Sequence, residues 1–363
     1  MSGRWYELTL TPATAPGVSP IQFGAVTTAA NGTTNIGNTT TQPPAAGVRQ
    51  WGSNLGGTFD PAAQNIEFDV LTTPYDEPTG SSVVILQGPD LDDLTQAHQF
   101  AGYTLTLKAG MKDGLPLSAD QGKPGLILQG VVVQGFGNWV GTDMELAFVI
   151  TAGIAYDYEN PGNIVLHWQS GQQLTDALTL TFKTAFPALV PDIQISPSLV
   201  LPYTETGMYS SLSELSRSVR AITRPMNIAP NYQGVRIWVH GNKIIARDFT
   251  VSSGRSPVQI NFNDLIGQPT WIAQDTIQVV TVLRSDVVMG DRILMPKNLP
   301  YGPGTITTSP SLQNSYQNFQ ASFTGSFVVT KVRQIGNSRN SDGQQWVTVI
   351  EAIANKYVSE APL

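Results

Sequence analysis

The sequence predicts a mainly β protein in which two β-barrel-like domains flank a small α+β linking domain with about two helices. Short runs rich in Val, Ile, Tyr and Thr recur towards both ends of the chain and are separated by Gly or Pro. Charged residues make up only 13%, about half of the usual ~25%. Polar character comes instead from Thr, Ser, Gln and Asn, with 34 Gly and 25 Pro. This mixture favours strands joined by turns and long loops over helices with charged faces.

The first predicted domain spans residues 1–155 and forms a β-barrel-like unit. Its strands are expected at Trp5–Leu10, Ile66–Leu71, Ser82–Gln87, Tyr103–Lys108, Leu126–Gln134 and Met144–Thr151. Between the first two lies a stretch at about 11–60 that is rich in Gly, Thr, Asn and Pro. A loop of this length in a compact domain is typical of a binding arm. We expect it to become ordered against a neighbour through the apolar anchors Ile21, Phe23 and Trp51.

The second predicted domain, residues 156–250, is the α+β linking domain. A strand at Ile164–Trp168 precedes a possible capping box at Ser170–Gln173 and apolar residues at helical spacing, which Pro187 ends. The same run also alternates as a strand would. A second helix is expected where Ser211 and Glu214 form a capping box ahead of one apolar stripe. A β-hairpin follows, with strands at Val235–Val239 and Ile244–Asp248 around a turn at His240–Lys243.

The third predicted domain, residues 251–363, returns to a β-barrel-like pattern. Strands are expected at Val258–Phe262, Ile277–Arg284, Arg292–Met295, Ser322–Arg333 and Trp346–Ala352, with a polar loop at 296–317. A chain of 363 residues exceeds the size at which one hydrophobic core stops growing, which supports a division into two or three domains.

Motifs that carry catalysis are missing from the sequence. The chain has no cysteine, and His98, His167 and His240 lie in three separate segments without ligand spacing. The glycines of Gly135–Gly141 do not fit a dinucleotide fingerprint and indicate a β-turn. Two groups of acidic residues could be read as the catalytic carboxylate pair of a glycosidase. Turns and helix caps explain them equally well, because both attract Asp. The groups are Asp90, Asp92 and Asp93, and Asp157 and Glu159. We therefore expect no enzyme activity, no cofactor and no metal.

The net charge of −7 disfavours general nucleic-acid binding, because phosphates are neutralised by basic residues. The N-terminus shows no apolar signal segment, and no run approaches the ~18 apolar residues that span a bilayer. We expect a protein that is made in the cytoplasm and that leaves the cell, if at all, only as part of a larger assembly. A surface this poor in charge also suggests that partners cover much of it.

One segment resembles a known family. Residues 257–296 contain the turn Leu265–Trp271, the strand that ends at Arg284 and the loop at Gly290. They resemble the baseplate hub proteins of contractile-tailed bacteriophages, and Trp168–Pro187 resembles the linking domain of the same family. Within the turn, Gly267, Gln268, Pro269 and Trp271 form a possible barrel or interface motif, in which Trp271 could cover the end of the barrel. An ordinary barrel corner explains the motif equally well.

The resemblance implies a structural hub that forms a homotrimeric ring. Such a ring joins the sixfold tail tube to the threefold central spike, contacts other baseplate proteins and lines the channel through which DNA leaves. It would lie in the tail baseplate of the virion, after assembly in the cytoplasm of the bacterial host. The net acidity would let DNA pass without sticking. Two alternatives remain open, a tail-fibre-like or carbohydrate-binding β-protein, and a tail-tip enzyme that degrades the cell wall.

Overall fold

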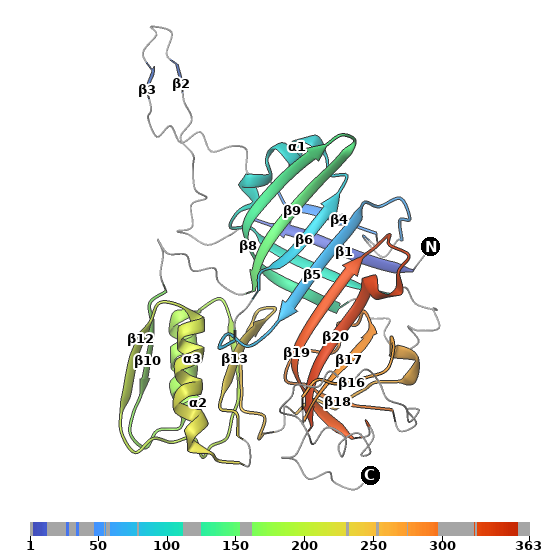
Figure 1. The fold of residues 1–363 in the computed structure, drawn as a ribbon. Coiled ribbons are helices and arrows are strands. Elements are labelled where there is room, and N and C mark those ends of the chain that lie inside the picture. The colour runs from blue at the N-terminus through green and yellow to red at the C-terminus, as the bar shows by residue number, and fades with distance from the viewer. Residues whose placement is uncertain are drawn as a thin grey trace.

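A computed structural model describes residues 3–12, 27–28, 34–35, 47–53, 55, 59–77, 80–111, 125–152, 162–229, 232–251, 254–273, 275–296, 323 and 325–354 (Figure 1). Within these residues the chain is mainly β with three α-helices, which confirms the predicted fold class. None of these helices is long and apolar enough to cross a membrane.

The N-terminal β region contains one antiparallel group of strands. They are β1 (Arg4–Thr11), β4 (Arg49–Gly52), β5 (Asn65–Thr72), β6 (Ser82–Gln87), β7 (Thr104–Met111), β8 (Gly125–Val140) and β9 (Asp143–Ala152). Two short strands, β2 (Thr27–Thr28) and β3 (Thr34–Asn35), pair with each other. The predicted alternation in β1 holds from Tyr6 to Leu10, where Tyr6, Leu8 and Leu10 are buried while Glu7 and Thr9 are partly exposed, as a half-buried strand requires. Trp5, which the pattern placed on the same face as Glu7, is also buried.

The C-terminal β region continues the same sheet. Its strands are β15 (Val258–Gln259), β16 (Thr270–Trp271), β17 (Thr276–Val282), β18 (Arg292–Leu294), β19 (Ser326–Asn337) and β20 (Trp346–Ala354). The sheet runs in the order β16-β17-β20-β19-β5-β6-β9-β8-β7-β1-β4, with β15 and β18 branching from β19. Figure 1 shows β5 and β19 side by side where the two regions meet. Among the described strands this path is open, and no pairing closes either region into a barrel.

The central region forms a separate layer of helices and strands. It contains β10 (Ile164–Trp168), α2 (Leu174–Ala185), β11 (Val190–Gln194), β12 (Glu205–Tyr209), α3 (Leu212–Thr223), β13 (Arg236–His240) and β14 (Lys243–Arg247). Both predicted helices are thus confirmed, and the hairpin of β13 and β14 turns at Gly241, which has a φ of 58°. The parallel strand β11 completes a three-stranded sheet beside β14.

The two predicted helix caps differ from the expected pattern. In α3 the Ser211 hydroxyl accepts a hydrogen bond from the Glu214 amide, but the Glu214 carboxylate accepts from Ser210 instead of Ser211. In α2 the N-cap is Gln173, and Ser170 instead donates to the Pro202 carbonyl. Helix α2 is therefore fixed by packing of its apolar face, which includes Leu174, Leu178 and Phe182, and not by a capping box.

The glycine-rich segment predicted as a turn continues strand β8. The strand runs to Val140, and Gly141, with a φ of 62°, makes the turn into β9. A Cβ at Gly135 would lie 2.3 Å from the Ala97 carbonyl oxygen, and one at Gly137 would lie 2.2 Å from that of Leu94. These glycines let the short helix α1 (Leu91–Thr95) and the 3₁₀ turn after it pack backbone to backbone against the strand.

Three main hydrophobic clusters follow the chain. The first gathers residues from 6 to 150 together with Leu283 and Trp346, the second residues from 164 to 246, and the third residues from 260 to 352. A fourth, smaller cluster joins the central region to the C-terminal β region through Trp238, Phe249 and Met289. The division into domains at residues 155 and 250 stays a prediction. Of the anchors proposed for the arm, Trp51 packs in the first cluster, and Ile21 and Phe23 lie outside the described residues.

The two β regions are joined by backbone pairing and by side chains. Residues 67–72 of β5 pair antiparallel with residues 332–337 of β19. The buried guanidinium of Arg4 donates to the carbonyls of Asn337, Asn340 and Asp342, and it lies over the Trp346 ring at 5.8 Å from the centroid. Phe68 of β5 packs edge to face on Trp346, with 5.4 Å between the ring centroids.

Replacing Gly336 with alanine should destabilise this seam. A Cβ at Gly336 would lie 2.2 Å from the ring of Phe68, which is held in place by Trp346. Overpacking of this kind costs about 1–3 kcal/mol. The free energy of unfolding in urea should fall by that amount for Gly336→Ala. Gly343→Ala is the control, because nothing lies within 4 Å of its new Cβ, and an equal loss in both variants would contradict the packing described here.

Candidate functional site

The predicted motif forms a corner at the edge of the C-terminal β region. Gly267 adopts a φ of +83° at an exposed turn, and Gln268 is exposed beside it. Pro269 is buried, and β16 follows and pairs with β17. The ring of Trp271 stacks on Phe323, with 5.7 Å between centroids and 19° between planes. The motif thus has two parts. Gly267 and Gln268 form an exposed turn, and Trp271 packs against the third hydrophobic cluster.

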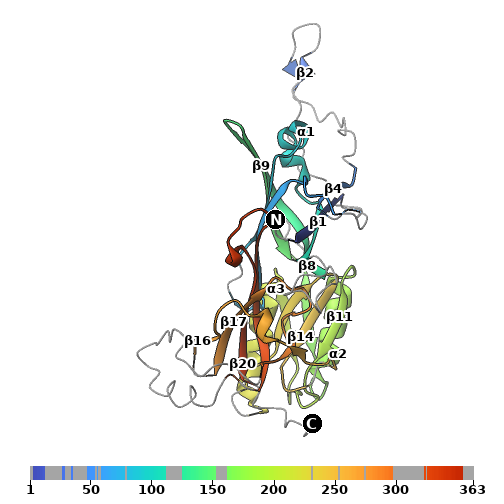
Figure 2. The same ribbon diagram turned by 90° about the vertical axis from the view of Figure 1, so that its right-hand side faces the viewer.

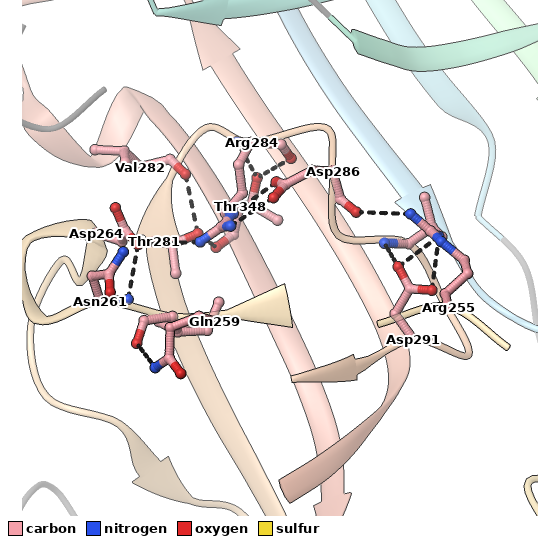
Figure 3. Close-up of polar contacts among 12 residues, drawn as sticks. Arg255, Gln259, Asn261, Asp264, Thr281, Val282, Arg284, Asp286, Asp291 and Thr348 are labelled. Carbon is pink, nitrogen blue, oxygen red and sulfur yellow. Dashed lines mark hydrogen bonds and ion pairs between the residues drawn. The ribbon is translucent and has the colours of Figure 1, made fainter. Parts of the chain in front are cut away.

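Arg284, two residues beyond β17, is the centre of a polar cluster on the inner side of this corner (Figure 3). Its side chain is 5% exposed and holds Asp286 in a bidentate pair, with Nε–Oδ1 and Nη2–Oδ2 distances of 2.8 and 2.6 Å. Nη1 lies 3.3 Å from Oδ2 of the buried Asp264. The backbone of Arg284 is fixed as well, because its amide donates to the Thr348 hydroxyl, which donates back to its carbonyl.

Asp264 connects this arginine to the turn before the motif. Its carboxylate accepts a hydrogen bond from the Asn261 amide at 2.9 Å, and the Asn261 side chain caps the Asp264 amide in return. This reciprocal capping box starts a single 3₁₀ turn, Phe262–Asp264, which leads directly into Leu265 and the motif. The buried carboxylate therefore ties the start of the corner to the end of β17.

A second ion pair lies beside the first (Figure 3). Asp291 accepts two bonds from Arg255, at 2.7 and 2.8 Å, and one from the Val288 amide at 3.0 Å. Burial raises the pKa of Asp291 to about 6, because the attraction of the half-exposed Arg255 offsets only part of the loss of water. Burial also acts on Asp286, but the hydrogen bonds and charge of Arg284 outweigh it and lower the pKa of that carboxyl.

A charged cleft of about 250 Å³ lies between the central region and the C-terminal β region. On its walls Glu77 pairs with Arg236 at 2.8 Å and with Lys331 at 3.1 Å, and Lys331 reaches Glu351 at 3.6 Å. Each of these four charges faces an opposite one. The cleft therefore has the character of an ion-pair network between two layers, and none of these groups is free to act as a general base.

The carboxylates of the corner are engaged in hydrogen bonds. Those of Asp264, Asp286 and Asp291 each accept from a guanidinium or a backbone amide. Within the described residues no three His, Asp or Glu side chains gather as a metal site. Of the acids considered for a glycosidase pair, Asp93 pairs with Arg49 at 3.1 Å, and Asp157 and Glu159 lie outside the described residues.

The structure places the three histidines apart, as their spacing indicates. His98 is exposed beside α1, and His167 pairs across β10 and β12 with the Thr206 hydroxyl at 2.7 Å. His240 is at the end of β13, where burial, with Arg255 and Lys243 nearby, lowers its pKa. The ion pairs of Asp264, Arg284 and Asp291 were not predicted. Two features of the sequence could have predicted this cluster. Asn261 and Asp264 have the spacing of a capping box, and Asp264, Arg284 and Asp291 are charged residues in a chain that has few of them.

Comparison with protein-family models and with curated proteins gives no match. Among solved structures, a 43 kDa tail protein of prophage MuSo2 from Shewanella oneidensis aligns at 7% identity with a TM-score of 0.44, covering 83% of this chain and 95% of that one. A type VI secretion component of E. coli, described as similar to T4 bacteriophage tail proteins, aligns at 10% identity with a TM-score of 0.46, covering 83% and 76%. The Francisella PdpA–VgrG complex aligns at 7% identity with a TM-score of 0.43, covering 99% and 59%.

These structural neighbours thus include phage tail proteins and a type VI secretion component. At TM-scores below 0.5 they assign no residue of this chain a role.

Replacing Arg284 with methionine should strongly destabilise the protein. The variant leaves the Asp264 carboxylate buried without its cation, and breaking a buried pair from one side costs about 3–5 kcal/mol. Urea unfolding of Arg284→Met should show that loss, and Asp264→Leu in the same chain should recover part of it. Arg333→Met is the control, since its pair with Asp69 is half exposed and is worth about 0–1 kcal/mol. Equal losses for both arginines would contradict a central role for Arg284.

Asp291 should make the protein less stable as the pH rises through 6. Its pKa is 3.8 when unperturbed and about 6 in the folded chain, so the folded state binds the proton more tightly. The resulting stabilisation is complete below about pH 3.8 and is lost as the pH rises through about 6. Between pH 4 and 7 the stability of Asp291→Asn should therefore rise relative to the parent protein. A carboxyl carbon of Asp291 that titrates near pH 4 by NMR would contradict this.

Proposed function

We propose that this chain is a structural hub of a contractile phage tail baseplate. In this proposal three copies form a ring that joins the sixfold tail tube to the threefold central spike and lines the channel for DNA. The protein works by assembly, without enzyme activity, cofactor or metal. It resides in the tail of the virion after assembly in the host cytoplasm, where it also contacts other baseplate proteins.

The observation that carries the proposal is the continuous sheet that joins the two β regions. Because β5 pairs with β19, one chain presents two β regions edge to edge, with the central region packed beside them (Figure 1). Three such chains around an axis would offer six β regions, which suits a component that matches sixfold and threefold neighbours. The resemblance of residues 257–296 to hub proteins supports the same assignment.

The character of the motif corner also supports an assembly protein. The ion pairs of Arg284 fix the base of the corner, while Gly267 and Gln268 remain exposed at its tip. A stiff base below an exposed turn is the arrangement that a contact loop needs, because little conformational freedom is lost on binding. We propose that Gly267, Gln268, Pro269 and Trp271 position an interface with another subunit or tail protein.

The net charge of −7 per subunit supports the proposed channel. Carboxylates facing the lumen of a trimer would repel DNA phosphates and prevent specific binding during passage. A neutral or basic lumen in the assembled ring would contradict this part of the proposal.

The oligomeric state tests the proposal directly. Light scattering should give a trimer for the chain alone or once the tail-tube and spike proteins of the same phage are added, because assembly is its function. A chain that stays monomeric and binds neither protein would overturn the proposal. Lysis of peptidoglycan by the purified chain, or soluble glycan affinity without tail-protein binding, would favour the two other functions considered from the sequence.

A further inference from the structure

The hairpin of β8 and β9 extends beyond its neighbour on the β8 side. Strand β7 pairs with β8 only as far as Val131, while the pairing of β8 with β9 continues to Val140 and Asp143. On the β9 side, β6 accompanies the hairpin as far as Glu145, which pairs with Gln87. Figure 2 shows the green end of this hairpin projecting from the upper part of the molecule beside α1. The end of β8 therefore has no neighbouring strand on its outer side.

The end of the hairpin carries large apolar side chains in water. Phe136, Trp139 and Val140 are 46%, 60% and 66% exposed, and Leu91 of α1 is 49% exposed. The indole nitrogen of Trp139 already donates to the Gly141 carbonyl at 3.0 Å, so its ring offers only apolar surface to a partner. Strand alternation places Phe136 and Val140 on one face of the hairpin and Trp139 on the other, so the tip presents an aromatic side chain on each of its two faces. Exposed aromatic side chains are the usual anchors of protein interfaces.

Helix α1 and the 3₁₀ turn that follows it support this tip by packing against β8. Gly135 and Gly137 let the carbonyls of Ala97 and Leu94 lie directly against β8, and the ladder to β9 runs to the last residue of the strand. A preformed surface loses less entropy on binding than a flexible one. The glycines that the sequence predicted as a β-turn instead support the tip, because they let α1 and the turn after it pack against β8.

The tip is also acidic. Asp90 and Asp92 of α1 and Asp143 of β9 are exposed, Glu145 is partly exposed, and none of the four forms an ion pair with a described residue. In a chain with only 13% charged residues, four unpaired carboxylates around an aromatic tip favour a basic partner surface.

A basic surface of that kind occurs on helix α3 of the same chain. Arg217 of α3 and Arg224, which directly follows the last residue of α3, are exposed seven residues apart on one side of this helical segment, with the exposed Ala221 and Pro225 between and beside them. The acidic residue of this segment, Glu214, lies one turn before Arg217. Within the described part of the chain neither guanidinium forms an ion pair with a carboxylate. Figures 1 and 2 place α3 in the lower part of the molecule, away from the hairpin tip, so one copy cannot satisfy both surfaces by itself.

We propose that the β8–β9 tip docks on the α3 face of a second copy of this chain. The contact joins different surfaces of the two copies, so each copy has one tip and one α3 face, and repetition around an axis closes a ring. Aromatic anchors bury against the small residues of α3 while carboxylates meet arginines. This inference rests on the proposed ring and assigns the surfaces that build it.

Two variants test the contact from its two sides. A tip variant, Phe136→Asp with Trp139→Asp, removes the anchors, and a face variant, Arg217→Glu with Arg224→Glu, reverses the basic surface. Each alone should weaken self-association roughly 30-fold or more, as loss of an interface hot spot does. Leu180→Asp is the control, because Leu180 of α2 is similarly exposed at 64% but lies outside both surfaces, and it should assemble normally. Unaltered thermal unfolding of each variant establishes that it is folded.

A mixture of the two variants gives the sharpest result. The tip variant keeps a normal α3 face and the face variant keeps a normal tip, so one productive contact remains between unlike chains. Analytical ultracentrifugation of the equimolar mixture should show heterodimers, each made of one tip variant and one face variant, and no closed trimers. Tail-tube and spike proteins are added if the parent chain needs them to assemble.

The outcomes separate this inference from the proposed function. Variants that still form trimers overturn the tip contact and leave the hub in place, whereas a parent chain that never associates overturns both. Binding of the parent chain, but not the tip variant, to neutral phosphatidylcholine vesicles, with no change in self-association, would instead assign the tip to a membrane and overturn the proposal.

Discussion

The backbone pairing between β5 and β19 is the constraint on which the rest of the structure depends. Through it, two β regions that are separated by the whole central region become parts of one sheet. The first hydrophobic cluster accordingly includes Leu283 and Trp346 from the far end of the chain. The segment that follows β5 then fixes the central region, because Tyr75 donates to the Ile237 carbonyl and Asp76 pairs with Arg220. One seam thus sets the positions of all three regions.

The few charges of this chain are concentrated where its parts meet. Arg4 binds three carbonyls across the seam, Glu77 and Lys331 join the central region to β19, and Arg284 fixes the motif corner. A buried cation with several acceptors is costly to disturb, and it specifies one arrangement of the parts more sharply than apolar contact does.

Local patterns predicted local elements well. The capping pattern at Ser211 and the apolar stripe that begins at Leu212 correctly predicted where α3 starts, since the sequence signals of a helix lie within a few turns of each other. The β5–β19 pairing was not predicted, because two alternating strands far apart in sequence contain no mark of their partner. Strand β8 was ended too early because its glycines, which make room for α1, resemble a turn. The Arg284 site was missed for the same reason as the seam, since its partners become neighbours only in the folded chain.

The seam also determines the order in which the protein can form as it leaves the ribosome. Residues 67–72 are synthesised well before their partners at 332–337, because the whole central region lies between them in the chain. Until then one side of β5 is an unpaired edge, the kind of strand that recruits other chains into aggregates. Asp69 and Glu67 lie on that edge, and their charges discourage such pairing before Arg333 and Asn337 arrive to bind them. The sheet can therefore be completed only after β19 has been synthesised, and a chain truncated before β19 would keep an open edge.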